Sequence, residues 1–334
     1  MKIVIDCDIP YILGVWEPYA EVAYLPGDQI SAEHVHDADA LIVRTRTRCN
    51  QALLEGSSVR VISTATIGTD HIDLEWCAAN GIRVESAAGC NARGVLQWVS
   101  AALVGVCRKR DWQPDELTLG VVGVGHVGSL VAEYAASWGF RVLRCDPPRS
   151  RREGPDGFCT LQELLPQCDI LTLHVPFTRA GSYPTEGLID ASALNLLPQH
   201  AVVFNSSRGG VVDEHALLES GHDFALDTWQ GEPNLNPEVL QRAIFATPHI
   251  AGYSRQGKAT ATSMACQAVA RALGVTIEIP SPIPPTTPRP ISWEELQGDI
   301  TRHFDISAES TVLKTHPEQF EQLRNNYAYR QEFF

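Results

Sequence analysis

The chain has 334 residues, of which 44% are hydrophobic and 20% are charged, and its formal net charge is −14. These proportions are typical of globular proteins, and a chain of this length normally forms about two domains. The negative charge disfavours nucleic acid and anionic membranes as partners, because both are themselves negatively charged.

Two further features bear on where the protein works. We find no run of about 18 apolar residues, and Asp6 interrupts the first apolar segment, which is unlike a signal peptide. The nine cysteines are scattered singly, without the spacing of a zinc site or a disulfide framework. We therefore expect a cytoplasmic protein with reduced thiols and no metal.

Short apolar segments alternate with helical segments from the start of the chain, as in α/β domains with parallel sheets. Between the last two strands of the first series, Asp73 can cap a short helix and Gly81 can end it. The strands of this series are predicted at Lys2–Asp6, Ala40–Val43, Val59–Ser63 and Ile82–Glu85.

A long helix is predicted over Asn91–Arg108, and a second series of six strands follows, as a complete dinucleotide-binding domain requires. The proline-rich residues 280–290 predict a stiff linker, which leaves Ile291–Phe334 as an appendage. The six strands are expected at Thr118–Val122, Arg141–Cys145, Ile170–His174, Ala201–Asn205, Asp223–Asp227 and Ile244–Ala246.

A glycine motif of the form G-x-G-x-x-G lies between a predicted strand and a predicted helix. Its glycines would allow a tight turn, close approach of a diphosphate and close packing of helix on strand. Such a motif alone is a weak signal, but here its context is complete. The motif predicts that the cofactor contacts Gly123, Gly125, His126, Val127 and Gly128.

The next predicted strand ends at Asp146, about 20 residues after the motif, where a ribose-binding acid is expected. A carboxylate there would accept hydrogen bonds from the ribose hydroxyls and repel a 2′-phosphate, which favours NAD over NADP. Arg149, Arg151 and Arg152 weaken this preference. The alternative is that Asp146 is a solvated turn residue.

Arg208, Glu232 and His249 each follow a different predicted strand, and ligands of open α/β sheets bind outside the carboxyl ends of strands. His249 could take the proton of a substrate hydroxyl, and Glu232 could orient its imidazole. Arg208 could bind a substrate carboxylate through two hydrogen bonds. Singly, these residues could be ordinary loop and surface groups. Together they indicate hydride transfer from a 2-hydroxy acid.

Arg44, Arg46 and Arg48 directly follow a predicted strand. In an extended segment their guanidinium groups would lie on one side and could bind a phosphate. The alternative is a row of exposed arginines on a polar edge.

These motifs resemble the D-isomer-specific 2-hydroxyacid dehydrogenases. The resemblance covers residues 1 to about 275, and the tail more faintly. It rests on the glycine motif with Asp146, the Ser207–Asp213 loop, the Asp227–Pro233 segment and the Pro248–Tyr253 segment. It implies an α/β fold of two Rossmann-like or flavodoxin-like parallel-sheet domains with a small C-terminal α/β appendage.

The resemblance also implies roles for individual residues and parts of the chain. Residues 1–90 with about 258–280 would bind substrate, residues 91–257 would bind NAD, and residues 285–334 would form a homodimer through a shortened appendage. Arg208, Glu232 and His249 would be catalytic. NAD would also contact Asp146, Val175, Ser206, Ser207, Arg208, Asp227 and Gly252, and a small phosphorylated 2-hydroxy acid would contact Thr45, Thr66 and Tyr253.

Two departures from the family pattern stand out: Gln230 occupies a position where an acid is usual, and the tail is short. Two alternatives stay open. One is another substrate of the same family, such as 3-phosphoglycerate, glyoxylate or hydroxypyruvate. The other is a non-catalytic NAD-sensing protein of the corepressor type.

Overall fold

The computed structural model describes residues 1–279 and 283–334 and divides into two compact units. Unit 1 comprises Met1–Asn91 and Ser254–Thr286, and unit 2 comprises Ala92–Tyr253 and Thr287–Phe334. Part of the predicted linker, residues 280–282, lies outside the described residues, and residues 283–290 contain no helix or strand.

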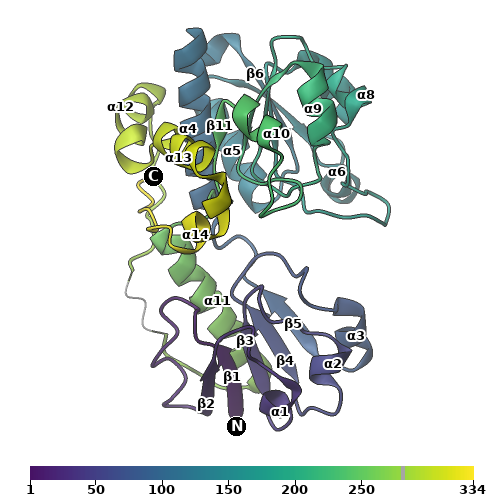
Figure 1. Cartoon of the computed structure of the whole chain (residues 1–334), viewed down its shortest axis with the longest axis vertical. Coiled ribbons are helices and arrows are strands. Elements are labelled where there is room, and N and C mark those ends of the chain that lie inside the picture. The colour runs from purple at the N-terminus through teal and green to yellow at the C-terminus, as the bar shows by residue number, and fades with distance from the viewer. Residues whose placement is uncertain (280–282) are drawn as a thin grey trace. The chain divides into compact units, whose positions relative to one another are not determined.

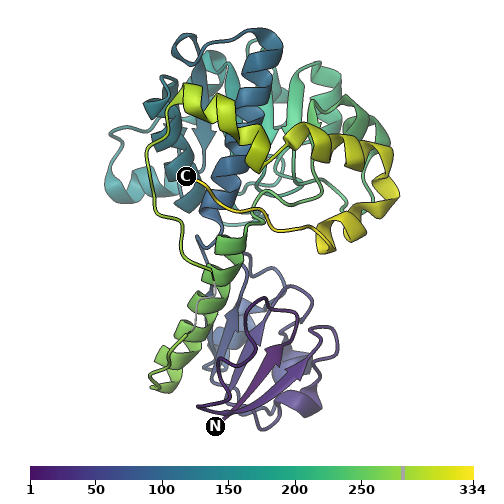
Figure 2. The same ribbon diagram turned by 90° about the vertical axis from the view of Figure 1, so that its left-hand side faces the viewer.

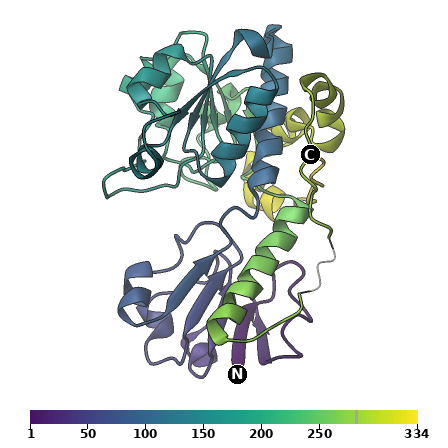
Figure 3. The same ribbon diagram turned by 180° about the vertical axis from the view of Figure 1, so that it is seen from behind.

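Unit 1 is a three-layer α/β domain with a five-stranded parallel sheet in the order β2-β1-β3-β4-β5. Long helix α11 lies along one face of this sheet (Figure 3). Its elements are β1 (Lys2–Asp6), β2 (Glu21–Leu25), α1 (Ala32–Val35), β3 (Ala40–Val43), α2 (Gln51–Leu54), β4 (Val61–Thr64), α3 (Leu74–Ala79), β5 (Arg83–Ser86) and α11 (Arg255–Leu273).

The period-two alternation of the strands builds two cores in unit 1. Ile3, Ile5 and Ile42 face α11 with Val269, whereas Val4 and its neighbours face the short helices α1 to α3. The predicted cap is confirmed, because Asp73 accepts a hydrogen bond from the Trp76 N–H at the start of α3.

Unit 2 contains a six-stranded parallel sheet in the order β11-β10-β9-β8-β6-β7 (Figure 1). Its elements before the tail are α4 (Ala92–Arg110), β6 (Thr118–Val122), α5 (His126–Ser137), β7 (Arg141–Cys145), α6 (Pro147–Glu153), α7 (Leu161–Leu164), β8 (Ile170–Leu173), α8 (Ala191–Leu194), β9 (Val202–Asn205), α9 (Glu214–Ser220), β10 (Asp223–Leu226), α10 (Pro237–Arg242) and β11 (Phe245–Ala246).

The predicted α/β class with two parallel sheets is confirmed, and all the predicted strands exist, with shifts of at most two residues at their ends. Strand β2 was not predicted from the sequence. In both sheets the order reverses beside the first strand, at β1 in unit 1 and at β6 in unit 2, and ligands of such sheets bind at this switch point.

The expected α/β character of the C-terminal appendage is wrong. The described part of the tail is helical, with α12 (Trp293–His303), α13 (Ile306–Thr315) and α14 (Phe320–Asn325) and without a strand. These helices belong to unit 2 instead of forming a separate domain: α12 and α13 pack against α4, and α13 also packs against β11 (Figure 2). The apolar stripe of α12, with Leu296 and Ile300 fully buried, explains this packing.

Among the described residues, the structure has no helix that is both long enough and apolar enough to cross a membrane. All nine cysteines carry free thiols.

Candidate active site

The glycine loop between β6 and α5 has the shape that a dinucleotide diphosphate needs. Gly123 has φ +85°, which side chains disfavour. A Cβ on Gly128 would lie 1.9 Å from the carbonyl oxygen of Gly123, so α5 can pack here only without a side chain. Gly125 precedes α5, and a Cβ there would meet nothing within 4 Å, which leaves this part of the loop open to a ligand.

A cavity of about 900 Å³, within the range of cofactor sites, opens beside this loop. Its lining includes five residues that we predicted to contact NAD: Gly123, Gly125, His126, Asp146 and Val175. Val127 is partly buried against the core of unit 2 and is not among the residues that line the cavity, so its contact with NAD stays a prediction.

His174, which the sequence suggested only as the end of a strand, also lines this cavity. Its Nε2 lies 3.0 Å from the hydroxyl of Thr172. Burial lowers the pKa of His174 to about 3, so the ring is neutral near pH 7.

Asp146 connects the end of β7 to the glycine loop. Its carboxylate accepts hydrogen bonds from the N–H groups of Val124 (2.8 Å) and Arg149 (2.9 Å) while it lines the cavity. The Arg149 guanidinium donates to the carbonyl oxygen of Val124 (2.7 Å), to Ser129 Oγ (2.9 Å) and to Glu153 (2.7 Å). The Arg149 guanidinium is therefore already hydrogen-bonded to groups of the protein. A guanidinium without these bonds could favour NADP by binding its 2′-phosphate.

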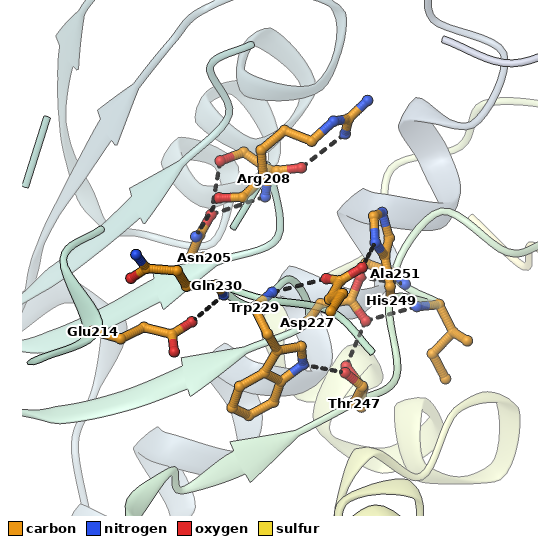
Figure 4. Close-up of polar contacts among 12 residues, drawn as sticks. Asn205, Arg208, Glu214, Asp227, Trp229, Gln230, Thr247, His249 and Ala251 are labelled. Atoms are coloured by element: carbon orange, nitrogen blue, oxygen red, sulfur yellow. Dashed lines mark hydrogen bonds and ion pairs between the residues drawn. The ribbon is translucent and has the colours of Figure 1, made fainter. Parts of the chain in front are cut away.

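The loop after β9 carries Arg208 and is shaped by Asn205. The Asn205 side chain accepts hydrogen bonds from the N–H and hydroxyl of Ser207 and donates to the carbonyl oxygen of Arg208 (2.9 Å). Arg208 Nη1 donates to the Ser207 carbonyl (2.8 Å; Figure 4). The buried Ser206 hydroxyl has no hydrogen-bond partner within the described residues, which fits a loop that completes its bonding with a cofactor.

Glu232 and His249, predicted to act together, are in direct contact. His249 Nδ1 lies 2.9 Å from Glu232 Oε2, and Glu232 Oε1 accepts a hydrogen bond from the Trp229 N–H (2.8 Å; Figure 4). No hydrogen bond to Nε2 of His249 is found within residues 1–279 and 283–334. With Nδ1 held by the carboxylate, Nε2 is the nitrogen that can exchange a proton with a ligand.

Asp227 has a different setting from the one we predicted, because its side chain is buried and bonded to the loop that carries His249. Its carboxylate accepts hydrogen bonds from the Thr247 hydroxyl (2.6 Å) and from the N–H groups of Ile250 (2.8 Å) and Ala251 (2.8 Å). The side chain therefore shapes the loop, and its contact with NAD stays a prediction.

Two carboxyl groups near the site, of the partly buried Glu232 and the buried Glu214, differ in the direction of their pKa shifts. Burial raises the pKa of Glu232, but the hydrogen bond and charge of His249, helped by the Trp229 N–H and Arg324, outweigh this and lower it. Burial raises the pKa of Glu214 to about 7, although Glu214 accepts a hydrogen bond from the Gln230 N–H at 2.5 Å. The sequence offered no role for Glu214, which directly follows the Ser207–Asp213 motif.

The extended geometry predicted after β3 is wrong, because residues 44–47 form a turn closed by the Thr47 N–H and the Arg44 carbonyl. Arg44 forms ion pairs with Asp6 and Asp8, both at 3.2 Å, whereas Arg46 is exposed. The turn stands at the switch point of the unit 1 sheet, so a substrate role for these arginines stays a prediction.

The remaining predicted substrate residues lie in both units. In unit 1, Thr45 is exposed and the Thr66 hydroxyl lies 2.6 Å from that of Thr64. In unit 2, Gly252 and Tyr253 end the His249 loop, and the Tyr253 ring packs on Tyr327 and Tyr329 of the tail.

Comparison with known proteins agrees with this geometry. Residues 97–251 match the model of the NAD-binding domain of D-isomer-specific 2-hydroxyacid dehydrogenases. A relative from Bacteroides thetaiotaomicron, named erythronate-4-phosphate dehydrogenase, is 44% identical over 99% of this chain and 97% of its own length. An Escherichia coli relative with the same name is 36% identical over 100% of this chain and 92% of its own length.

Among solved structures, NAD⁺-bound 3-phosphoglycerate dehydrogenase from Entamoeba histolytica shares the fold, with a TM-score of 0.69 at 24% identity, over 86% of this chain and 99% of its own. The chain thus belongs to the D-isomer-specific 2-hydroxyacid dehydrogenases, the family that its motifs predicted. It is an NAD-dependent dehydrogenase, and the prediction of NAD as cofactor is confirmed.

Proposed function

We propose that this enzyme oxidises 4-phospho-D-erythronate to 2-oxo-3-hydroxy-4-phosphobutanoate with NAD, a reaction of pyridoxal 5′-phosphate (vitamin B6) biosynthesis. Relatives with the name of this activity align with essentially the whole chain, at 36% to 44% identity.

The contact between Glu232 and His249 carries the proposal. Oxidation of the C2 hydroxyl removes a proton from oxygen and a hydride from carbon. The Nε2 atom of His249 would take the proton while Glu232 holds Nδ1 and stabilises the imidazolium that forms. Bound NAD supplies the nicotinamide that accepts the hydride.

Arg208 would pair with the substrate carboxylate and stabilise charge on the C2 oxygen. The phosphate would be bound by Arg44 and Arg46, and Thr45, Thr66 and Tyr253 would contact the rest of the substrate. Asp146, Ser206 and the glycine loop would hold the cofactor.

An assay of the purified protein with NAD tests the substrate assignment. We expect a higher kcat/KM with 4-phospho-D-erythronate than with D-erythronate, 3-phosphoglycerate or D-glycerate, followed through absorbance of the reduced nicotinamide. The first turnover should be recorded as well, so that activity is seen even when the cofactor is retained. A preference for 3-phosphoglycerate would contradict the substrate assignment, and no reduction with any acid would favour an NAD-sensing role.

A His249→Asn variant tests the catalytic assignment, because asparagine keeps polarity but cannot accept the proton. We expect kcat to fall by about 10²–10⁴-fold. His215→Asn is the matched control, since the side chain of His215 is 81% exposed and contacts only the surface residue Glu219 among the described contacts. Equal rates for both variants would contradict a base role for His249.

We further propose that the enzyme acts in the cytoplasm as a homodimer formed through residues 285–334, as the family resemblance suggests. Light scattering combined with size-exclusion chromatography tests the oligomeric state. A monomer at micromolar concentration would contradict the dimer.

A further inference from the structure

The end of the chain holds the loop that carries His249. Arg330 is buried in unit 2, with only 7% of its surface exposed. Its Nη1 atom donates a hydrogen bond to the carbonyl oxygen of Ile250 (3.0 Å), and its Nη2 atom donates to the carbonyl oxygens of Ala251 and Gly94, the latter at 2.7 Å. The guanidinium also lies 4.4 Å from the centre of the Phe304 ring.

Asp227 binds the same two residues through their other backbone groups. The N–H groups of Ile250 and Ala251 both donate to its carboxylate at 2.8 Å. Two consecutive residues therefore have their N–H groups held by a buried anion and their carbonyl groups held by a buried cation. Hydrogen bonds to charged groups contribute more than neutral ones, so this arrangement fixes the loop firmly.

The loop has a reason to need such support. His249, directly before the clamped residues, has φ +57°, a left-handed conformation that is unfavourable for a residue with a side chain. Strained backbone of this kind persists only where its surroundings hold it.

We propose that Arg330 is a positioning residue for His249: it clamps the backbone of Ile250 and Ala251 so that the imidazole keeps its place against Glu232. The inference rests on the proposed function of His249 as the base. It assigns the tail a role within its own chain, in addition to any role in dimerisation.

Other contacts of the tail act on the same loop. On α13, the Ser310 hydroxyl accepts a hydrogen bond from the Ala246 N–H (3.0 Å), at the end of the strand that leads to His249. Tyr327 and Tyr329 pack edge-on against Tyr253, with ring centres 6.2 and 6.0 Å away. The tail thus contacts the segment before, within and after the loop.

The test compares Arg330→Met and Arg330→Lys with a control, Arg302→Met. Arg302 also lies in the tail, but its side chain is 79% exposed and pairs only with Asp299 among the described ion pairs. We expect kcat of Arg330→Met to fall by about 10–100-fold, because small displacements of a catalytic group are costly. NAD affinity should stay within about twofold, since Arg330 does not line the cavity.

Arg330→Lys should retain an intermediate kcat, because an ammonium group cannot reproduce the fork of a guanidinium. This variant keeps the buried charge and serves as the test should Arg330→Met fail to fold. The control should match the wild type. A purely structural role would lower the melting temperature while kcat per folded molecule stayed unchanged, and that result would overturn the proposal.

Amide hydrogen exchange of residues 249–253 gives a readout independent of substrate. We expect faster exchange there in both Arg330 variants, with little change at Gly123–Gly128. Should the wild type prove inactive on every 2-hydroxy acid, faster exchange would still support the clamp, and only the proposed function would fail. An active wild type with unchanged kcat and exchange in both variants would overturn the clamp alone.

Discussion

Units 1 and 2 have parallel sheets of similar topology but differ in the residues that follow their strands. Both contain a parallel sheet whose order reverses beside the first strand. In unit 2 this point carries a glycine loop, a helix N-terminus and a cavity of about 900 Å³. In unit 1 it carries Arg44 bound by Asp6 and Asp8. The shared fold provides the location of a site, and the residues after the strands decide what it can bind.

Among variants that test this difference between the units, Gly128→Ala should have the largest effect, which is a loss of NAD affinity. The added Cβ would lie 1.9 Å from the carbonyl oxygen of Gly123, so the glycine loop must deform. We expect NAD affinity to fall about 1000-fold, or about 4 kcal/mol, in a calorimetric titration. The control is Gly298→Ala on α12, where a Cβ would meet nothing within 4 Å. Equal NAD affinity in the two variants would show that the loop does not bind the diphosphate.

Glu214→Gln should have the next largest effect, on the pH dependence of stability. Burial raises the pKa of Glu214 to about 7 from 4.5. Between these values the folded state holds a proton that the unfolded chain has lost, so stability falls as pH rises through this window. At 1.36 kcal/mol per pH unit, the loss approaches roughly 3 kcal/mol at most.

Glutamine can still accept the Gln230 N–H but does not ionise, so the variant should be the more stable protein at pH 8 and lose less stability between pH 5 and pH 8. Urea unfolding at several pH values measures this. Asp213 is next to Glu214 but caps α9 near the surface, so Asp213→Asn should keep the wild-type pH dependence. Parallel stability curves for Glu214→Gln and the wild type would contradict the buried ionisation.

A smaller loss of NAD affinity, about tenfold, is expected for Asp146→Ala. The carboxylate lines the cavity and also binds the N–H groups of Val124 and Arg149. Asp156→Ala is the control, because Asp156 is exposed and lies outside this cavity. Unchanged NAD affinity for Asp146→Ala would overturn the role of Asp146 in ribose binding.

Much of the fold could be predicted because its signals are local. Most central strands of the two sheets are largely apolar and buried, such as β3 (ALIV) and β8 (ILTL), as expected for sheets covered on both faces. Strand β2 was missed because it is an edge strand whose residues are only partly buried, so its pattern is weak. The helical tail was assigned the wrong structure because the family resemblance, and not its own amphipathic spacing, guided that prediction.

The candidate site likewise has features that could be predicted from the sequence and features that could not. Glu232 and His249 could be paired from the sequence because each follows a strand and their chemistry is complementary. The clamp by Asp227 and Arg330 could not, because Arg330 lies 80 residues from Ile250 and binds the loop through backbone carbonyls, which every residue has. The turn at Arg44 was also missed, since its ion pair with Asp6 joins residues 38 positions apart.

An effect of the same size as that of Asp146→Ala is expected in unit 1, from Arg44→Ala and Arg46→Ala tested separately. If these arginines bind the phosphate, each change should raise KM for 4-phospho-D-erythronate about tenfold, while kcat and NAD affinity stay near the wild type. Arg60→Ala, which removes an exposed ion pair with Asp39 in the same unit, should leave KM unchanged. KM for unphosphorylated D-erythronate should not respond to any of the three changes, because it has no phosphate to lose. If KM for the phosphorylated acid is the same in all three variants as in the wild type, the strand ends of unit 1 do not bind the phosphate, and Arg44 serves only to neutralise Asp6 and Asp8.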